Sequence, residues 1–335
     1  MAKIGVIGAG SWGTALAVLL CQNGNEVILW SHRWEQVQYM QEKRECDKLP
    51  GITLPEALRF TGDMEEVVEG AQLLVLAVPS TATRQTAERI KPYLKSSQIL
   101  CSVSKGIEET TLLTQCGILM DVLGQKQSIG VLSGPSHAEE VILGLPTVVV
   151  AGAQERHVAE YIQNCFMNDV FRVYTSPDIV GIEIGASLKN VIALAAGMSD
   201  GLGFGDNTKA ALITRGIREI SALALAMGGN AETLSGLAGT GDLIVTCSSQ
   251  HSRNRKAGML IGQGLSPEEA MHQVHMVVEG VYSAKAALSL GEKYQVTLPI
   301  IEQVNQVLFF GKDPKTAVRS LMERDKKSEI DVIGW

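Results

Sequence analysis

Short runs of apolar residues alternate with helix-compatible stretches along the first half of the chain. Residues 73–78 are apolar at every position, which is typical of a parallel strand covered on both faces. Strands that alternate with helices at this rhythm predict an open, doubly wound α/β sheet of the Rossmann type. The expected strands are residues 3–7, 26–30, 73–78, 99–103, 128–132, 147–151 and 170–174. The expected helices are residues 14–20, 34–43, 63–68 (with Asp63 as N-cap), 83–94, 111–123 and 158–166.

The pattern changes after Ser176 and Pro177, where helical periodicity replaces the alternation and no further strand is expected. The expected helices are residues 178–198, 209–227, 253–262, 267–271, 277–290, 298–309 and 315–322. We therefore expect a dinucleotide-binding domain over residues 1–177 and an all-helical substrate domain over residues 178–335. Two domains without a flexible linker favour a ligand site in the cleft between them. The charged stretch 323–331 is expected to be solvated, and residues 332–335 match no known pattern.

Residues 179–198 form the one apolar stretch that could be mistaken for a membrane span. Glu183, Lys189 and Asn190 lie in its middle, and a charged side chain at the centre of a bilayer is costly. Glycine and alanine also recur there at four-residue intervals. We therefore expect a buried helix of a soluble protein, with no integral membrane segment.

A glycine-rich loop separates the first expected strand from the first helix. Gly8, Gly10 and Gly13 have the spacing GxGxxG. In this setting Gly8 takes the sharp turn, Gly10 lets a pyrophosphate approach the backbone, and Gly13 lets the helix pack close to the strand. The N-terminus of the helix then presents free N–H groups and a positive dipole end to the phosphates. The context favours a dinucleotide site over an ordinary βα turn that binds nothing.

The end of the second strand bears on which dinucleotide binds. A site that prefers NAD normally carries Asp or Glu there, which holds the ribose 2′-hydroxyl and repels a 2′-phosphate. Here Ser31, His32 and Arg33 follow the strand, with no acid among them. Because Arg33 can pair with a 2′-phosphate through two N–H groups, we favour NADP(H). NAD(H) stays possible, since Arg33 could instead stack on the adenine or cap the end of the strand.

Composition and charge narrow the class of protein. The 335 residues suggest two domains, and the 45% hydrophobic content allows a large core. A net charge of −7 argues against generic nucleic-acid binding, although a few placed cations could still hold an anionic substrate. The six cysteines are scattered without a CxxC motif, which predicts reduced core residues in a reducing compartment. No basic and apolar leader precedes the first strand.

Lys189 is the only cation in some twenty mostly apolar residues. On a helix its neighbours include Gly185 and Ala186, whose small side chains are expected to leave room for a ligand beside the amine. Burial disfavours the charged form of a lysine and lowers its pKa, which suits a general base that takes a proton from an alcohol. The alternative is a lysine that reaches the surface or pairs with Glu183.

Polar clusters at predicted strand and helix ends suit an anionic ligand. They are Lys105 after residues 99–103, residues 133–138 after residues 128–132, the turn 238–243 with Asp242 as its carboxylate, and Ser252, Arg253 and Asn254 at a helix start. Each alone could be a cap or a surface group, but their occurrence together with a dinucleotide loop and a buried lysine favours a phosphate-bearing substrate. His272 and His275 have a spacing that could suit a metal, but no third ligand is evident, so we expect no metal site.

In order along the chain, these motifs resemble those of NAD(P)-dependent sn-glycerol-3-phosphate dehydrogenases, most closely the bacterial type. The matching segments are residues 8–15, 104–106, 133–138, 189–190, 239–243 and 252–254, and the resemblance covers nearly the whole chain. It implies the interconversion of dihydroxyacetone phosphate plus NAD(P)H and sn-glycerol 3-phosphate plus NAD(P)+. It further implies a role in glycerophospholipid synthesis in the cytoplasm, with a small phosphorylated triose as substrate and often a homodimeric enzyme.

The resemblance also implies roles for individual residues. Lys189 corresponds to the family's proton acceptor. The implied substrate contacts are Lys105, Gly134, Ser136, Lys189, Asp242, Ser252, Arg253 and Asn254. The implied cofactor contacts are Gly8, Gly10, Ser11, Trp12, Gly13, His32, Arg33, Lys105, Ala138, Arg253, Val277 and Glu279. Asp242 is expected to orient the substrate or to tune the lysine by opposite charge.

Two other classes of protein compete with this interpretation. Dehydrogenases of β-hydroxyacids or phosphogluconate also place a Lys-Asn pair on the helix that joins two domains, but residues 252–254 and 239–242 argue against them. A dinucleotide-sensing protein without turnover would bind the cofactor tightly and would not need Lys189. A panel of substrates distinguishes all three.

Overall fold

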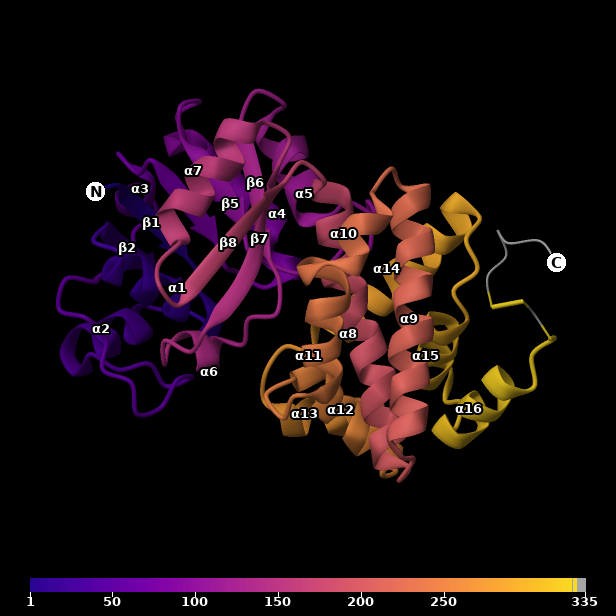
Figure 1. The fold of residues 1–335 in the computed structure, drawn as a ribbon. Helices are drawn as coiled ribbons and strands as arrows, with labels where there is room; N and C mark the ends of the chain where they lie inside the picture. The colour runs from indigo at the N-terminus through magenta and orange to yellow at the C-terminus, as the bar shows by residue number, and fades with distance from the viewer. Residues whose placement is uncertain (327, 330–335) are drawn as a thin grey trace.

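The computed structural model describes residues 1–326, 328 and 329. Figure 1 shows a sheet-based part that holds the N-terminus beside a helical part that holds the C-terminal half of the chain. The described residues of the charged stretch 323–331 are exposed, as expected, and residues 332–335 lie outside the described residues.

The strands form one eight-stranded sheet in the order β3-β2-β1-β4-β5-β6-β7-β8. Neighbouring strands are parallel except for β6 and β7, which are antiparallel. The strands are β1 (Lys3–Ile7), β2 (Glu26–Trp30), β3 (Arg59–Thr61), β4 (Leu73–Leu76), β5 (Ile99–Ser102), β6 (Ser128–Ser133), β7 (Thr147–Ala153) and β8 (Phe171–Ser176). The chain reverses its direction of winding at β1, so loops at the carboxyl ends of β1 and β4 flank the crevice where such sheets bind ligands.

Helices cover both faces of this sheet, as the fully apolar strands predict. The helices of this part are α1 (Ser11–Gln22), α2 (Trp34–Lys43), α3 (Met64–Val68), α4 (Thr83–Ile90), α5 (Gln115–Leu123), α6 (Ala138–Val141) and α7 (Arg156–Phe166). Along β4, Leu73 and Val75 join the core under α1, α2 and α7, whereas Leu74 and Leu76 join the core under α3, α4 and α5. Short 3-10 turns lie at Ser80–Ala82 and Lys91–Tyr93. The predicted N-cap Asp63 is confirmed, because its carboxylate accepts from Glu65 N at 3.0 Å.

Several local predictions were incomplete or wrong. The three-residue edge strand β3 and the four-residue α6 were missed, because such short elements carry no readable periodicity. The helix predicted over residues 111–123 begins only at Gln115. The preceding residues form a tight loop closed by a bridge between Ile107 and Thr114, and Leu112 has a positive φ of 60° there.

In the second part, helices joined by short loops make up the described residues after β8, which contain no strand, as predicted. Its helices are α8 (Ile179–Gly201), α9 (Asp206–Ala226), α10 (Ala231–Ser235), α11 (Asp242–Ser248), α12 (Arg253–Gly262), α13 (Pro267–Val274), α14 (Glu279–Tyr294), α15 (Pro299–Phe310) and α16 (Pro314–Met322). The short α10 and α11 were not predicted. The polar turn expected around Asp242 is a π-helical turn, Leu237–Gly241, that continues directly into α11.

Helix α8 runs through the centre of the helical part, with α9, α11, α12 and α14 packed around it (Figure 1). Among the described residues it is the one helix long and apolar enough to cross a membrane, and 94% of its most apolar window is buried inside the protein. The recurring glycines allow a close helix crossing. A Cβ at Gly197 would lie 2.0 Å from Arg255 O, and one at Gly258 would lie 2.1 Å from Leu194 O. The prediction of a buried helix is therefore confirmed.

Candidate active site

The glycine loop between β1 and α1 has the geometry that a dinucleotide requires. Gly8 has φ +117°, and a Cβ on it would lie 2.6 Å from Ala77 O, so only glycine fits there. A Cβ on Gly13 would lie 1.9 Å from Gly8 O, which explains the close packing of the helix on the loop. The space beside Gly10 is open, with no heavy atom within 4 Å of a built Cβ.

The N-terminus of α1 also suits a pyrophosphate. Gly10 is the N-cap and supplies no side-chain hydrogen bond, so the N–H groups of the first turn, from Ser11, Trp12 and Gly13, are not capped by that residue. Uncapped N–H groups beside an open glycine form an anion site. The chain therefore fits a dinucleotide at this loop.

The end of β2 is tied to the glycine loop by a residue that the sequence analysis missed. Gln36 on α2 accepts a hydrogen bond from Ser31 Oγ at 2.7 Å and donates from Nε2 to Ala9 O at 2.8 Å. His32 and Arg33 are exposed beside it, and Arg33 is the N-cap of α2. The only signal for Gln36 in the sequence was its place in the first turn of the helix expected over residues 34–43. These contacts fix the loop next to the two side chains that were predicted to select the cofactor.

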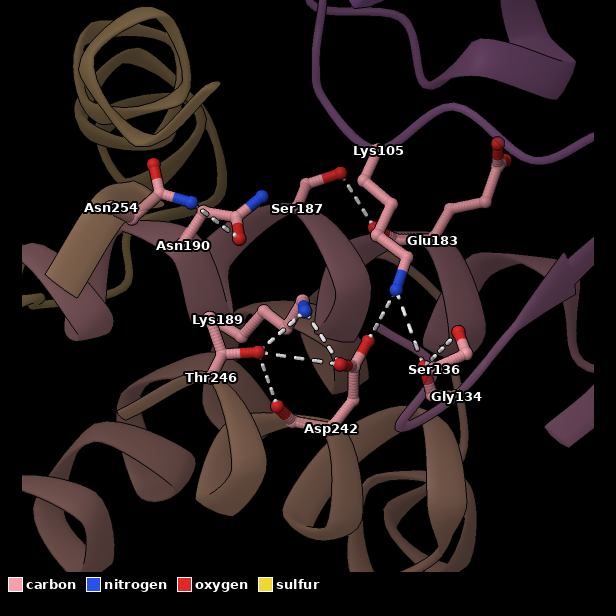
Figure 2. A network of polar contacts seen from close by, with 10 residues as sticks. All are labelled: Lys105, Gly134, Ser136, Glu183, Ser187, Lys189, Asn190, Asp242, Thr246 and Asn254. Carbon is pink, nitrogen blue, oxygen red and sulfur yellow. Dashed lines mark hydrogen bonds and ion pairs between the residues drawn. The ribbon is translucent and has the colours of Figure 1, made fainter. Parts of the chain in front are cut away.

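Buried Lys189 and Asp242, with the half-buried Lys105, form the centre of the site (Figure 2). Lys189 Nζ lies 2.5 Å from Asp242 Oδ1, and Lys105 Nζ lies 2.7 Å from Asp242 Oδ2. Lys189 comes from α8, Asp242 from the start of α11, and Lys105 from the loop after β5, so the site joins both parts of the chain. Lys189 and Asp242 are 5% and 1% exposed, which keeps the pair away from bulk water.

Burial and neighbouring charges act in opposite directions on these groups. Burial lowers the pKa of Lys189 to about 8, although the Asp242 carboxylate raises it, and Lys105 lowers it further. Burial also raises the pKa of Asp242, but the ammonium groups of Lys105 and Lys189 outweigh this and hold it below its usual value. Lys189 can therefore gain and lose a proton near neutral pH while Asp242 stays charged.

Thr246 is a further member of this centre that the sequence analysis missed. Its hydroxyl accepts from Lys189 Nζ at 2.7 Å and donates to the backbone oxygen of Asp242 at 2.6 Å. It lies one helical turn after Asp242 on α11, and that i, i+4 spacing could have indicated it. The contact fixes the direction of the amine.

The loop after β6 contributes backbone groups close to Lys105. Lys105 Nζ donates to Gly134 O at 3.3 Å, and Ser136 Oγ donates to the same oxygen at 2.9 Å. Gly134 has φ +147°, and a Cβ on it would lie 2.9 Å from Val149 Cα. The predicted contacts Lys105, Gly134 and Ser136 are thus brought together.

The structure excludes the alternative partner of Lys189 and corrects one expectation about its surroundings. Lys189 does not pair with Glu183, whose Oε1 accepts from Cys116 N at 2.8 Å instead. The space at Gly185 that was expected to admit a ligand is filled, because a Cβ there would lie 2.7 Å from Ala238 O. The small side chain at this position allows the π-helical turn to pack on α8.

The start of α12 carries the expected cap. Ser252 Oγ accepts from Arg255 N at 3.2 Å. Asn254 is buried: its Nδ2 donates to Asn190 Oδ1 at 3.0 Å, and its Oδ1 accepts from Gly280 N at 2.9 Å. Asn254 therefore joins α12 to α8, as Figure 2 shows, and also to α14.

The predicted cofactor contacts from the later half of the chain approach the sheet. Glu279, the first residue of α14, accepts from Ser80 N at 3.2 Å and from Ser80 Oγ in the turn after β4. Burial raises the pKa of Glu279, and the half-buried Arg253 is close enough to lower it. Val277 is exposed two residues earlier, and Ala138 begins α6, which packs on α1.

The cysteines and paired histidines have no visible chemical role. All six cysteines are free, and five of them are buried. His272 and His275 are exposed, with ring centroids 5.9 Å apart. Within the described part of the chain, no group of three or more His, Cys, Asp or Glu side chains could hold a metal ion.

A dinucleotide loop on a doubly wound sheet, joined to a buried lysine–aspartate pair on a helical domain, defines an NAD(P)-dependent dehydrogenase. The family model for the NAD-dependent glycerol-3-phosphate dehydrogenase N-terminus matches residues 3–159, and that for the C-terminus matches residues 178–319. The chain belongs to this family. The predicted resemblance, oxidoreductase class, glycerol-3-phosphate dehydrogenase function and use of NAD(P) are therefore confirmed.

Relatives along the whole chain agree with this assignment. A glycerol-3-phosphate dehydrogenase (NAD(P)+) of Agathobacter rectalis is 59% identical and covers 100% of both chains. One of Fusobacterium nucleatum is 55% identical and covers 98% of this chain and 99% of its own. The crystal structure of a glycerol-3-phosphate dehydrogenase from Coxiella burnetii has a TM-score of 0.93 at 37% identity, over 96% of this chain and 99% of that one.

Proposed function

We propose that the protein interconverts dihydroxyacetone phosphate and sn-glycerol 3-phosphate with Lys189 as the group that exchanges the proton of the hydroxyl on carbon 2. The bound nicotinamide supplies or accepts the hydride. The observation that carries the proposal is the buried Lys189 amine, 2.5 Å from Asp242 and with its pKa lowered to about 8. Such an amine is neutral often enough to take the proton in oxidation and charged often enough to return it in reduction.

The surrounding groups provide binding and orientation. Asp242 holds Lys189 and Lys105 at its two oxygens, so both amines face one shared region (Figure 2). We assign Lys105, Gly134 and Ser136 to the carbonyl end of the substrate. The phosphate would lie at the start of α12, held by Ser252, Arg253 and Asn254 through the helix N-terminus and the guanidinium.

We assign the cofactor to the crevice above β1 and β4. Its contacts would be Gly8, Gly10, Ser11, Trp12, Gly13, His32, Arg33, Lys105, Ala138, Arg253, Val277 and Glu279. Arg33 at the end of β2, with no acid beside it, supports a preference for NADP(H). We further propose that the boundary between the two domains lies between residues 177 and 178. We also propose that the enzyme is a homodimer and that it is located in the cytoplasm.

The direct test is an assay of dihydroxyacetone phosphate reduction in which the loss of reduced-nicotinamide absorbance is monitored. Arg253→Ala is expected to raise KM for dihydroxyacetone phosphate roughly ten- to a hundredfold, because an ionic hydrogen bond to the phosphate contributes about 1.5–3 kcal/mol. Lys256→Ala, an exposed cation on the same helix, is the control and should keep the wild-type KM. Equal use by the wild type of dihydroxyacetone phosphate and unphosphorylated dihydroxyacetone would exclude a phosphate site.

Cofactor preference is tested at Arg33. Arg33→Ala is expected to lower kcat/KM for NADPH by roughly tenfold or more and to leave that for NADH nearly unchanged, since only NADPH carries the 2′-phosphate. Arg172→Ala, at an exposed arginine on β8, is the control. A wild-type enzyme whose kcat/KM clearly favours NADH would contradict the proposed preference.

A further inference from the structure

Glu183 is a buried carboxylate that the proposed reaction leaves without a role. It is 3% exposed and lies on α8, six residues before Lys189. In Figure 2 its side chain extends away from Lys189 and toward the sheet-based part. Its Oε1 accepts from Cys116 N at 2.8 Å, and its Oε2 has no hydrogen-bond partner among the described residues.

This contact crosses from the helical part to the first turn of α5. Cys116 is the second residue of α5, whose N-cap Thr114 accepts from Gly117 N at 3.3 Å. A carboxylate at a helix N-terminus satisfies a free N–H group and interacts favourably with the dipole. Burying a carboxylate is costly, so an acid here serves this one helix start rather than general packing.

The start of α5 in turn holds the loop that carries Lys105. Gln115, the first residue of α5, donates from Nε2 to Gly106 O at 3.0 Å and accepts from Thr83 Oγ1 at 2.5 Å. Gln115 is 1% exposed, so these bonds are protected from water. Gly106 directly follows Lys105, and the loop is therefore fixed by α5 on one side and by Asp242 on the other.

We infer that Glu183 is a positioning residue for Lys105, acting through Cys116, Gln115 and Gly106. Helix α8 then positions both cations of the site: it carries Lys189 itself and positions Lys105 through the start of α5. The inference rests on the proposed function, because Lys105 is assigned there to substrate binding. Loss of the Glu183 contact would weaken one support of the loop that carries Lys105. It would remove no direct contact of Lys189, Asp242 or the glycine loop.

The experiment compares Glu183→Met with Glu183→Gln and with the matched variant Glu219→Met. Glu219 is also buried and also caps a helix, accepting from Ile300 N at 2.7 Å and from Ile301 N at 3.2 Å, but it lies outside the site. Glu183→Met is expected to raise KM for dihydroxyacetone phosphate about tenfold, as for one lost polar contact. KM for NADPH should rise by less, because Lys105 is only one of many assigned cofactor contacts. Glu183→Gln keeps an oxygen acceptor and should restore most of the affinity.

The pH profile gives a second readout. Lys105 lowers the pKa of Lys189, so displacement of Lys105 should raise that pKa. Because oxidation needs the neutral amine, the rising limb of the pH–rate profile for glycerol 3-phosphate oxidation should then move to higher pH. Gln115→Met cuts the link to Gly106 while leaving Glu183 in place, and should reproduce both effects even if Glu183→Met does not fold. Glu219→Met is expected to lower the melting temperature but to change neither KM nor the limb.

The possible outcomes separate the two proposals. If the wild type is active but Glu183→Met and Gln115→Met match Glu219→Met in KM and in pH limb, Glu183 is only a structural cap and the inference is overturned. If the wild type itself fails to turn over dihydroxyacetone phosphate or glycerol 3-phosphate, the proposed function fails and the inference fails with it.

Discussion

Lys189→Ala is expected to lower kcat for both directions of the reaction by about a thousandfold, the usual range for removal of a general acid–base group. The amine is buried and bonded to Asp242 and Thr246, so no solvent-exposed lysine can take its place. The glycine loop lies on the sheet-based part, so Kd for NADPH, measured by fluorescence titration, should stay near the wild-type value. Dihydroxyacetone phosphate reduction under single-turnover conditions checks the loss.

The control for this change is Lys209→Ala. Lys209 is also a lysine of the helical part paired with an aspartate, at 2.8 Å from Asp200, but it lies outside the site. Its removal should leave kcat within about twofold, because its partner Asp200 is not among the residues assigned to the site. Near-wild-type kcat in Lys189→Ala would remove this residue from the mechanism.

The fold was readable from the sequence wherever a pattern extended over several residues. The fully apolar run at β4 predicted a strand covered on both faces, and the capping residues Asp63 and Ser252 predicted two helix starts. The glycine spacing predicted the tight βα turn, since a Cβ at position 8 or 13 would clash with the backbone. The edge strand β3 and the loop before α5 had no such pattern, because tertiary contacts define them.

The site was predictable in its members but not in its connections. Lys189, Asp242 and Lys105 each stood out by charge in an apolar or turn context, although they are separated by up to 137 residues along the chain. The pairing of Lys189 with Asp242 rather than Glu183 depends on how α11 crosses α8, which no local spacing reveals. Gln36 and Thr246 were missed for another reason: a polar residue on a helix is usually exposed, and the helix that carries Thr246 was itself not predicted.

Asp242→Asn is expected to have the second-largest effect, because this carboxylate holds two ammonium groups at 2.5 and 2.7 Å. Asparagine keeps an oxygen acceptor but leaves Lys189 and Lys105 facing each other without the negative charge. We expect kcat/KM for dihydroxyacetone phosphate to fall about a hundredfold and the free energy of unfolding by about 3 kcal/mol, as for a broken buried ion pair. Asp200→Asn is the matched control, since Asp200 also pairs with two cations, Arg255 and Lys209, but lies outside the site.

The pH dependence of Asp242→Asn distinguishes a tuning role from a purely structural one. In the wild type, oxidation of glycerol 3-phosphate needs the neutral amine, so its rate should rise with pH through about 8, the pKa of Lys189. Asp242 raises that pKa, whereas burial and Lys105 lower it, so losing the carboxylate must move the limb to lower pH. In the reduction direction the same variant should lose rate at lower pH than the wild type, because the protonated amine disappears earlier. A limb that stays near pH 8 in Asp242→Asn, or that moves equally in Asp200→Asn, would show that the carboxylate does not set the protonation of Lys189.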